Sequence, residues 1–281
     1  MFSVIIPLYN KELSIGNTIK SVLGQTFQDF EIIVVNDGST DKSSEKVQEF
    51  SDSRIRIIYQ DNQGVSTARN RGILEAKFEW IAFLDGDDLW EESHLEEIVQ
   101  MMKMFLGNKV FVTSFEYSDG RNMFKHPRKT QVFKIQNYFT EALKEVLICT
   151  NTVVVNKNCF EMVGVFNPEL SRGEDMDMWV RLAKKYEIVK SNKVTSVYRI
   201  EAENRATSKI SLMKSKVYYL DLENAKHLDE KKYYKQHIFN TLLNLLAEGD
   251  VKNFYMLLRR YKGCFLFFEL IPFYIRKKAQ R

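Results

Sequence analysis

Three carboxylates stand within four residues of this sequence, at Asp85, Asp87 and Asp88, directly after the strand-like apolar run 80–84. Carboxylates crowded at the end of a buried strand repel one another, and a divalent cation between them removes that repulsion. Oxygen ligands of this kind suit Mg²⁺ or Mn²⁺, which usually complete their coordination with substrate phosphates and water. The motif therefore predicts a metal-bound phosphate compound at the carboxyl end of a parallel sheet, where open α/β folds bind ligands.

The alternative role for these acids is a helix N-terminus. Asp87 or Asp88 could cap a helix running from Glu91 to Met104, because acidic residues complement the helix dipole there. One aspartate would serve that purpose, so three together favour the metal. A calcium loop of the EF-hand type is excluded, because leucine and tryptophan follow at positions 89–90 where such a loop needs a polar ligand and a glycine.

Two further segments carry polar groups at the ends of candidate elements. Asp37 follows the candidate strand 31–35 and precedes Gly38. It can accept a hydrogen bond from the imide N–H of a ligand such as a uracil ring, or form a turn before a helix cap, and both roles are compatible. Gly64 permits an unusual backbone at a helix start, where the free amides favour anions. Arg69 on that helix would be a fixed positive group near the anion, or an ordinary solvated side chain.

Apolar runs that are typical of strands alternate with helical patterns in the first third of the chain. Continuous apolar strands of this kind indicate a parallel sheet covered by helices on both faces. Strands are predicted at 3–7, 31–35, 54–59 and 80–84, and helical spacing links Ile15, Ile19, Val22 and Leu23, and also Val65, Ala68, Gly72 and Ala76.

The rest of the chain shows different patterns of apolar residues. The middle predicts further strands at 110–115 and 152–155 and a helix at 175–186. We therefore predict an α/β domain over 1–205 and a helical C-terminal region over 206–281. The apolar positions with helical period in that region are Ile210, Met213, Val217 and Leu220, then Ile238, Leu242, Leu245 and Leu246.

The composition is that of a soluble globular protein. Of the 281 residues, 44% are apolar and 28% are charged, which excludes disorder as the main state. Cys149, Cys159 and Cys264 form neither a disulfide framework nor a zinc-type pair, which suits a reducing cytosol. The apolar run 2–8 is too short for a signal peptide and lacks a basic flank, so we expect a strand there.

The net charge of +4 is uneven, because residues 250–281 alone carry +6. A basic tail on a near-neutral body suggests an anionic surface as partner. Residues 254–275 are rich in aromatic and apolar side chains, but four charged residues interrupt them, so no run approaches the ~20 apolar residues of a spanning helix. Two interpretations stay open: segment 254–281 lies on an anionic membrane, or it packs on the protein as an ordinary helix.

Together these segments resemble the family 2 inverting glycosyltransferases, which have the GT-A fold: a Rossmann-like, mostly parallel central sheet with helices on both faces. Each motif is modest alone, but their order and spacing over residues 2–200 are highly specific. The matching segments are VIIPLYN (4–10), VNDGSTD (35–41), NQG (62–64), ARN (68–70), FLDGDD (83–88), GVF (164–166), GED (173–175) and WVRL (179–182).

The resemblance implies a UDP-sugar donor and gives roles to individual positions. Pro7, Tyr9 and Asp37 would surround the uracil and ribose. Asp85 and Asp87 match the family's Asp-x-Asp element, in which the first contacts ribose or metal-bound water and the second binds the Mn²⁺ or Mg²⁺ that bridges the pyrophosphate. The implied nucleotide-binding residues are Pro7, Tyr9, Asp37, Arg69 and Asp85, and the implied metal ligand is Asp87.

The resemblance also assigns the catalytic base to Asp175, with Glu174 beside it orienting the acceptor. An inverting transfer needs a carboxylate that removes the proton of the acceptor hydroxyl as that oxygen attacks C1, and such proton transfer gives ~10²–10⁴-fold in rate. The metal offsets charge on the departing phosphate. Taken alone, these two acids would indicate only the acidic first turn of a helix.

One departure from the family pattern concerns the end of the catalytic domain. Family members often carry a histidine after Tyr-Arg-x, near the metal or pyrophosphate, and here Glu201 takes that place. A carboxylate could bind a hard cation, but it adds negative charge near UDP, which Arg205 could offset. Asp88, Glu201 and Arg205 are therefore further candidates for this part of the site.

Other enzyme classes lack their motifs in this chain. No Gly-x-Gly-x-x-Gly follows the first strand, no Gly-Lys-Ser/Thr loop exists, and no nucleic-acid recognition motif is present. The predicted function is hexosyl or N-acetylhexosaminyl transfer from a UDP-sugar to a hydroxyl of a glycan or lipid-linked glycan, in bacterial surface polysaccharide synthesis. The expected location is the cytoplasm, with the inner face of the cytoplasmic membrane left open. The alternative is a non-catalytic nucleotide-sugar-binding module or a partner subunit of a polysaccharide assembly complex.

Overall fold

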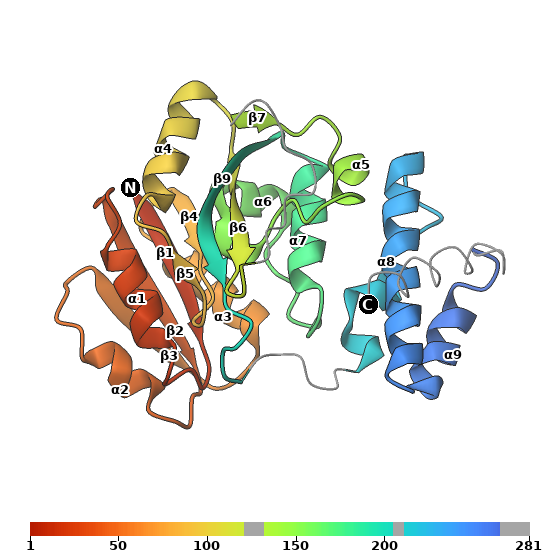
Figure 1. The fold of residues 1–281 in the computed structure, drawn as a ribbon, viewed down its shortest axis with the longest axis horizontal. Helices are drawn as coiled ribbons and strands as arrows, with labels where there is room; N and C mark the ends of the chain where they lie inside the picture. Colours follow the sequence, from red (N-terminus) through yellow and green to blue (C-terminus); the bar gives the residue numbers. More distant parts are fainter. Residues whose placement is uncertain (121–131, 205–210, 265–281) are drawn as a thin grey trace.

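Four strands pair in parallel in the N-terminal half of the protein. The computed structural model describes residues 1–120, 132–204 and 211–264, and Figure 1 shows this sheet at the left. Every residue of β2 is buried, as continuous apolar strands predict for a sheet covered on both faces. In the order of pairing, the strands are β3 (Ile55–Gln60), β2 (Phe30–Asp37), β1 (Phe2–Leu8) and β4 (Trp80–Phe83).

The sheet continues beyond β4 with mixed pairing, which the sequence did not indicate. β8 lies antiparallel between β4 and β6, β9 runs parallel to β6, and β5 and β7 pair antiparallel with β9. These strands are β5 (Leu89–Trp90), β6 (Val110–Tyr117), β7 (Val132–Lys134), β8 (Val153–Asn156) and β9 (Ile188–Tyr198).

Helices cover both faces, because alternate residues of each strand enter two separate cores. Val4 and Ile6 of β1 pack with α1, α2 and α4, whereas Ile5 packs with α3, α6 and α7. The predicted α/β class with the GT-A arrangement is confirmed. The helices are α1 (Ile15–Leu23), α2 (Ser43–Gln48), α3 (Val65–Glu75), α4 (His94–Met104), α6 (Asn158–Val163) and α7 (Glu174–Ala183).

The expected helix at 91–104 starts later than the sequence suggested. α4 begins at His94, and Leu89 and Trp90, which come shortly before it, form β5, which pairs with β9. Asp87 and Asp88 therefore lie before a strand, so the interpretation of them as helix caps is wrong. A two-residue strand carries too little pattern to be recognised from sequence, and its pairing partner lies over a hundred residues away.

The C-terminal region packs beside α7, at the right of Figure 1. Val180 of α7 and Phe139 of α5 share one apolar core with Ile238 and Leu242 of α8. The domain boundary near residue 205 stays a prediction. The elements here are α5 (Tyr138–Ala142), η1 (Thr150–Thr152), η2 (Leu212–Lys214), η3 (Lys216–Tyr219), α8 (Leu228–Ala247) and α9 (Val251–Arg260).

The helical period seen between Ile210 and Leu220 was misleading. Ile210 is outside the described residues, and the rest forms two short 3-10 helices separated by extended Ser215. The backbone there bonds to another segment: Lys216 N–H donates to the Arg172 carbonyl at 2.9 Å. Those bonds replace the i to i−4 pairs that a helix would need.

The described part of segment 254–281 packs on the protein. Leu257 of α9 is fully buried, and the Tyr261 hydroxyl donates to the Val217 carbonyl at 2.7 Å. Over the ranges that the structure describes, no helix is long and apolar enough to cross a membrane. Residues 265–281, which hold half of the predicted membrane-facing charges, lie outside those ranges, so contact with an anionic membrane stays a prediction.

Candidate active site

Three of the predicted site segments meet because their strands are neighbours. Pro7 lies in β1 opposite Val35 of β2, Asp37 ends β2, and Asp85 follows β4 by two residues. All three strands run parallel, so their carboxyl ends form one edge of the sheet. Tyr9, just beyond β1, is 39% exposed at this edge. The sequence motifs are therefore brought together as predicted.

Asp37 holds the loop that enters α3. Its carboxylate is buried and accepts hydrogen bonds from Gln60 Nε2 at 2.8 Å, Gln63 N at 2.9 Å and Gly64 N at 2.8 Å. Gly64 has φ 89°, a conformation that residues with a Cβ rarely adopt. A carboxylate offers about four lone-pair positions, so this arrangement leaves about one for a ligand.

Arg69 of α3 connects two acidic motifs that are far apart in sequence. Its guanidinium is 3% exposed and contacts Asp85 Oδ1 at 2.7 Å and Glu174 Oε1 at 3.1 Å, 105 residues away. The ring of Phe166 lies beneath it, 5.3 Å from the guanidinium carbon. Burial alone would lower the pKa of Arg69, but the two carboxylates reverse that and raise it. Arg69 is thus a buried bridge, and the solvated alternative is wrong.

Replacing Arg69 with methionine is expected to destabilise the protein by about 3 kcal/mol, because it leaves two partly buried carboxylates without their shared cation. Burial raises the pKa of Glu174, and Asp175 adds to that rise while Arg69 opposes it. A carboxyl with a raised pKa binds more protons in the folded than in the unfolded protein. The stability of the folded protein therefore falls as the pH rises above the ordinary pKa of that carboxyl. The loss of unfolding free energy in Arg69→Met, measured by urea unfolding, should therefore be larger at pH 8 than at pH 5.

The matched control is Arg71→Met on the same helix, where the exposed arginine pairs with Glu75 and the change should stay below about 0.5 kcal/mol. Equal losses in the two variants would contradict the bridging role of Arg69.

Asp87 pairs with a lysine that the sequence did not single out. Lys11 Nζ lies 2.6 Å from Asp87 Oδ2, and it also donates to the Glu203 carbonyl at 2.5 Å and the Asn204 carbonyl at 3.2 Å. Burial raises the pKa of Asp87, Lys11 opposes the rise, and Asp85 adds to it. Three oxygens thus surround one positive group, which is an environment that a hard cation also prefers.

We expect Lys11→Met to bind Mn²⁺ about tenfold more tightly, because a competing charged hydrogen bond to Asp87 is removed. The measurement is electron paramagnetic resonance of free Mn²⁺ in the presence of UDP. Lys20→Met is the control, since that lysine is exposed on α1. Weaker Mn²⁺ binding in Lys11→Met would show that the lysine assists the cation and does not compete with it.

Asp88 turns away from this cation position. Its carboxylate is 2% exposed and accepts hydrogen bonds from Asn151 Nδ2 at 2.8 Å and Arg199 N at 2.9 Å. Burial, with Asp85 and Asp87 nearby, raises the pKa of Asp88 well above its ordinary value. The Thr18 hydroxyl donates to the Asp88 carbonyl at 2.9 Å. Asp88 therefore joins the acidic loop to η1 and to the end of β9.

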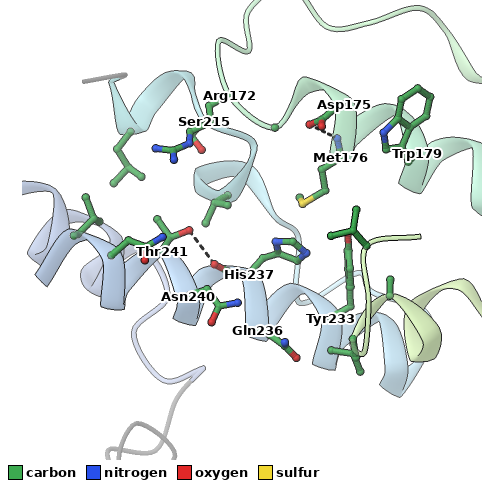
Figure 2. A pocket seen from close by; sticks show the side chains of 18 of the residues that line it. Arg172, Asp175, Met176, Trp179, Ser215, Tyr233, Gln236, His237, Asn240 and Thr241 are labelled. Atoms are coloured by element: carbon green, nitrogen blue, oxygen red, sulfur yellow. Dashed lines mark hydrogen bonds between the residues drawn. The ribbon is translucent and has the colours of Figure 1, made fainter. Parts of the chain in front are cut away.

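Glu174 and Asp175 begin α7, as the sequence predicted. Gly173 before them has φ 75°, and a Cβ there would lie 3.1 Å from the Lys216 side chain, so the tight turn requires glycine. Asp175 Oδ1 accepts from Met176 N at 2.7 Å, and the same side chain lines a cavity of about 1350 Å³ between α7 and α8 (Figure 2). Asp175 therefore lines the cavity directly beside Glu174, which Arg69 contacts.

Glu201 pairs with Ser118 and Arg199. It is about half exposed, and it accepts hydrogen bonds from the Ser118 hydroxyl and from Arg199 Nε at 3.1 Å. The bond from Ser118 lowers the pKa of Glu201 to about 2, with Arg199 contributing. Glu201 therefore forms an ion pair with Arg199, and within the part of the chain that the structure describes none of its hydrogen-bond partners belongs to the contacts around Asp87. Arg205 lies outside the described residues.

Glu203 has a role that the sequence gave little sign of. Its carboxylate accepts from Leu13 N and Ser14 N, both at 3.0 Å, and from the Ser14 hydroxyl at 2.5 Å. It thereby caps the start of α1, 190 residues earlier in the chain, where the Ser14 amide also donates to the Lys11 carbonyl at 3.1 Å. An acid in a polar loop is common, so only the tertiary contact reveals this cap.

The site residues fit a divalent cation that takes part of its coordination from a substrate. Within residues 1–120, 132–204 and 211–264, no three His, Cys, Asp or Glu side chains converge as a complete metal cage. Mg²⁺ commonly uses only one or two carboxylates together with phosphates and water. Asp87, with Asp85 beside it in the loop, supplies that donor set at a position already occupied by a positive charge.

Comparison with known proteins gives the family. The model for glycosyl transferase family 2 matches residues 3–163. A UDP-Glc:alpha-D-GlcNAc-diphosphoundecaprenol beta-1,3-glucosyltransferase, WfgD of Escherichia coli, is 31% identical over 222 residues, which are 76% of this chain and 83% of that protein. An uncharacterized glycosyltransferase of Rickettsia bellii is 33% identical over 72% of this chain and 29% of its own length. This chain spans about a third of the length of the Rickettsia relatives that it matches.

A solved structure extends the likeness to the C-terminal helices. The structure of S. aureus TarS residues 1–349 in complex with UDP-GlcNAc aligns with a TM-score of 0.67 over 95% of this chain and 93% of that one, at 16% identity. At this sequence identity, the likeness shows that the two chains share a fold. The family match and the relatives together establish that this chain belongs to glycosyl transferase family 2.

Proposed function

We propose that this protein is a metal-dependent, inverting glycosyltransferase that moves a hexose or N-acetylhexosamine from a UDP-sugar to a hydroxyl of a glycan or lipid-linked glycan, in the synthesis of a bacterial surface polysaccharide. The observation that carries the proposal is the Arg69 bridge, which holds Asp85 of one acidic motif and Glu174 of the other at the same point. The bridge supports the proposal because it brings Asp85, a proposed donor-binding residue, close to Glu174, the neighbour of the proposed base Asp175.

The donor would bind at the carboxyl ends of the parallel strands. Pro7, Tyr9 and Asp37 would contact the nucleoside, and the free acceptor position on Asp37 suits a single N–H of a uracil ring. A divalent cation held by Asp87 with Asp85 would supply positive charge for the diphosphate. Arg69 orients Asp85 through their 2.7 Å contact. These assignments follow the family resemblance and the strand order.

Asp175 would act as the base on the acceptor side. Its carboxylate removes the proton of the acceptor hydroxyl while that oxygen forms a bond to C1 of the sugar, and the bond from C1 to the UDP oxygen breaks. A single displacement inverts the configuration at C1, and the proton ends on Asp175. Glu174, held by Arg69, would orient the acceptor beside it.

The relatives support the choice of donor and acceptor class. WfgD is named for transfer of glucose from UDP-Glc to a GlcNAc linked to diphosphoundecaprenol, and TarS has been crystallised with UDP-GlcNAc. We infer the same donor nucleotide and an acceptor of the same general type for this chain. The cytoplasmic location and the membrane contact remain predictions on the same basis.

The test is UDP release from a panel of UDP-sugars, with and without Mn²⁺, in the presence of lipid-linked GlcNAc diphosphate and free glycans. We expect release with at least one donor, dependent on both Mn²⁺ and an acceptor. Binding of a UDP-sugar without acceptor-dependent release would favour the alternative, a non-catalytic binding module of an assembly complex.

A further inference from the structure

A short segment of the C-terminal region runs beside the chain that enters α7. Ser215, between η2 and η3, forms a parallel bridge with Arg172, and Figure 2 shows these two residues next to each other. The Arg172 amide donates to the Lys214 carbonyl at 3.3 Å, and the Lys216 amide donates to the Arg172 carbonyl at 2.9 Å. The backbone directly before α7 is therefore held by hydrogen bonds to the C-terminal region.

The side chain of Lys216 continues this contact along the first turn of α7. It packs closely on Gly173, where an added Cβ would lie 3.1 Å from the Cβ of the lysine. Its Nζ lies 2.6 Å from Asp177 Oδ1. The Asp177 amide in turn donates to the Gly173 carbonyl at 3.0 Å. Lys216 therefore contacts both ends of this turn, and Glu174 and Asp175 lie between those ends.

The ion pair of Lys216 with Asp177 is partly buried. The lysine side chain is 23% exposed and the aspartate side chain is 10% exposed, so water and salt screen this pair less than a surface pair. Asp177 Oδ2 also accepts a hydrogen bond from Arg181 Nε at 2.9 Å, one turn further along the helix. The carboxylate is thus held from two sides, which gives the lysine a fixed partner.

Arg181 extends these contacts to the loop beneath the Arg69 bridge. Its guanidinium donates to all three carbonyls of loop 163–165. Phe166 follows this loop, and its ring lies 5.3 Å from the guanidinium carbon of Arg69. Asp177 therefore connects the Arg69 bridge, through Arg181, with the C-terminal region, through Lys216.

We propose that Lys216 is a positioning residue, which holds the first turn of α7 so that Asp175 and Glu174 keep the orientation that glycosyl transfer requires. The inference rests on the proposed function, because it takes Asp175 as the base. Lys216 acts through Gly173 and Asp177 and not on the substrate. A misplacement of about 1 Å by a residue away from the chemistry can cost ~10²-fold in rate. The C-terminal region thereby contributes to the reaction by fixing the base.

The first experiment compares the unmodified full-length protein with Lys216→Met and Lys216→Arg. Methionine keeps an unbranched apolar chain but removes the charge, whereas arginine keeps a cation that can pair with the carboxylate of Asp177. In Lys216→Met we expect kcat for acceptor-dependent UDP release to fall about 10–100-fold, with the Kd for UDP by calorimetry unchanged. Lys216→Arg should recover most of the lost rate.

The second experiment needs no turnover. Amide hydrogen exchange over residues 173–178, followed by mass spectrometry, should be about tenfold faster in Lys216→Met, because the ion pair that opposes local opening of the turn is lost. Lys184→Met is the matched control, since it removes another lysine of the α7 and α8 contact, which pairs with Glu230 near the far end of α7. The control should leave kcat and the exchange of residues 173–178 unchanged.

Unchanged kcat in Lys216→Met would overturn the inference, and so would exchange that rises equally in Lys184→Met. A fall in kcat that Lys216→Arg does not restore would also overturn it, because the positive charge would not be the cause. If the unmodified protein released no UDP, the proposed function would fail, and the exchange comparison would still decide whether Lys216 holds the turn. Release by the unmodified protein with unchanged kcat in Lys216→Met would sink this inference alone.

Discussion

Asp175→Asn should lower kcat for glycosyl transfer by ~10²–10⁴-fold, because asparagine cannot take the proton of the acceptor hydroxyl. The substitution keeps the size of the side chain and a carbonyl oxygen for the Met176 amide, which Asp175 Oδ1 accepts at 2.7 Å. Donor binding should therefore survive. Initial rates of UDP release, together with the Kd for UDP measured by calorimetry, separate the two effects.

The control for this variant is Glu161→Gln, which removes an exposed carboxylate on α6 outside the cavity and should leave kcat unchanged. Retained kcat in Asp175→Asn would reject this residue as the base. Glu174 would be the next candidate, although its contact with Arg69 makes it better suited to orientation than to proton transfer.

Asp87→Asn is expected to weaken both transfer and metal binding. Metal stabilisation of developing phosphate charge supplies several kcal/mol, and each 1.4 kcal/mol is tenfold in rate, so we expect kcat/KM to fall about 100-fold or more. An amide oxygen still accepts from Lys11 Nζ, which limits disturbance of the loop. The direct measurement is Mn²⁺ affinity by electron paramagnetic resonance, which needs no turnover.

Asp29→Asn gives the comparison for Asp87→Asn, because Asp29 is a mostly exposed carboxylate with only a long contact to the chain N-terminus. If Asp87→Asn bound Mn²⁺ as tightly as Asp29→Asn, the cation would not be held by Asp87. A fall in rate without a fall in Mn²⁺ affinity would instead point to a role for the Lys11–Asp87 pair in holding residues 203 and 204.

The parallel half of the sheet was predictable because its signals are local. Residues 32–35 are all apolar, as a strand buried on both faces requires, and the polar motifs follow such strands directly. Parallel strands end at one edge, so the order of motifs was enough to predict that Asp37 and Asp85 would lie near each other. The start of α7 at Glu174 was also predicted within one residue, from apolar positions such as Met178, Val180 and Leu182, whereas its end at Ala183 comes three residues before the predicted one.

β9 shows where the sequence pattern was insufficient. It contains Lys190 and Ser191, which interrupt the apolar pattern, yet both are buried. Lys190 Nζ donates to the Thr113 and Leu147 carbonyls at 3.2 and 2.9 Å, and the Ser191 hydroxyl donates to Glu97 at 2.6 Å. A buried polar group is tolerated when it is hydrogen-bonded, and those partners lie 43 to 94 residues away.

By itself, the sequence determined the α/β class, the family resemblance and the residue types that could hold a cation or remove a proton, because each depends on neighbours along the chain. The tertiary structure decided which charges meet: Lys11 with Asp87 across 76 residues, and Arg69 with Glu174 across 105. It also decided that His237 and Thr241 of α8 line the same cavity as Asp175. Helical spacing shows which residues share a face, but only packing against α7 and α5 fixes where that face points.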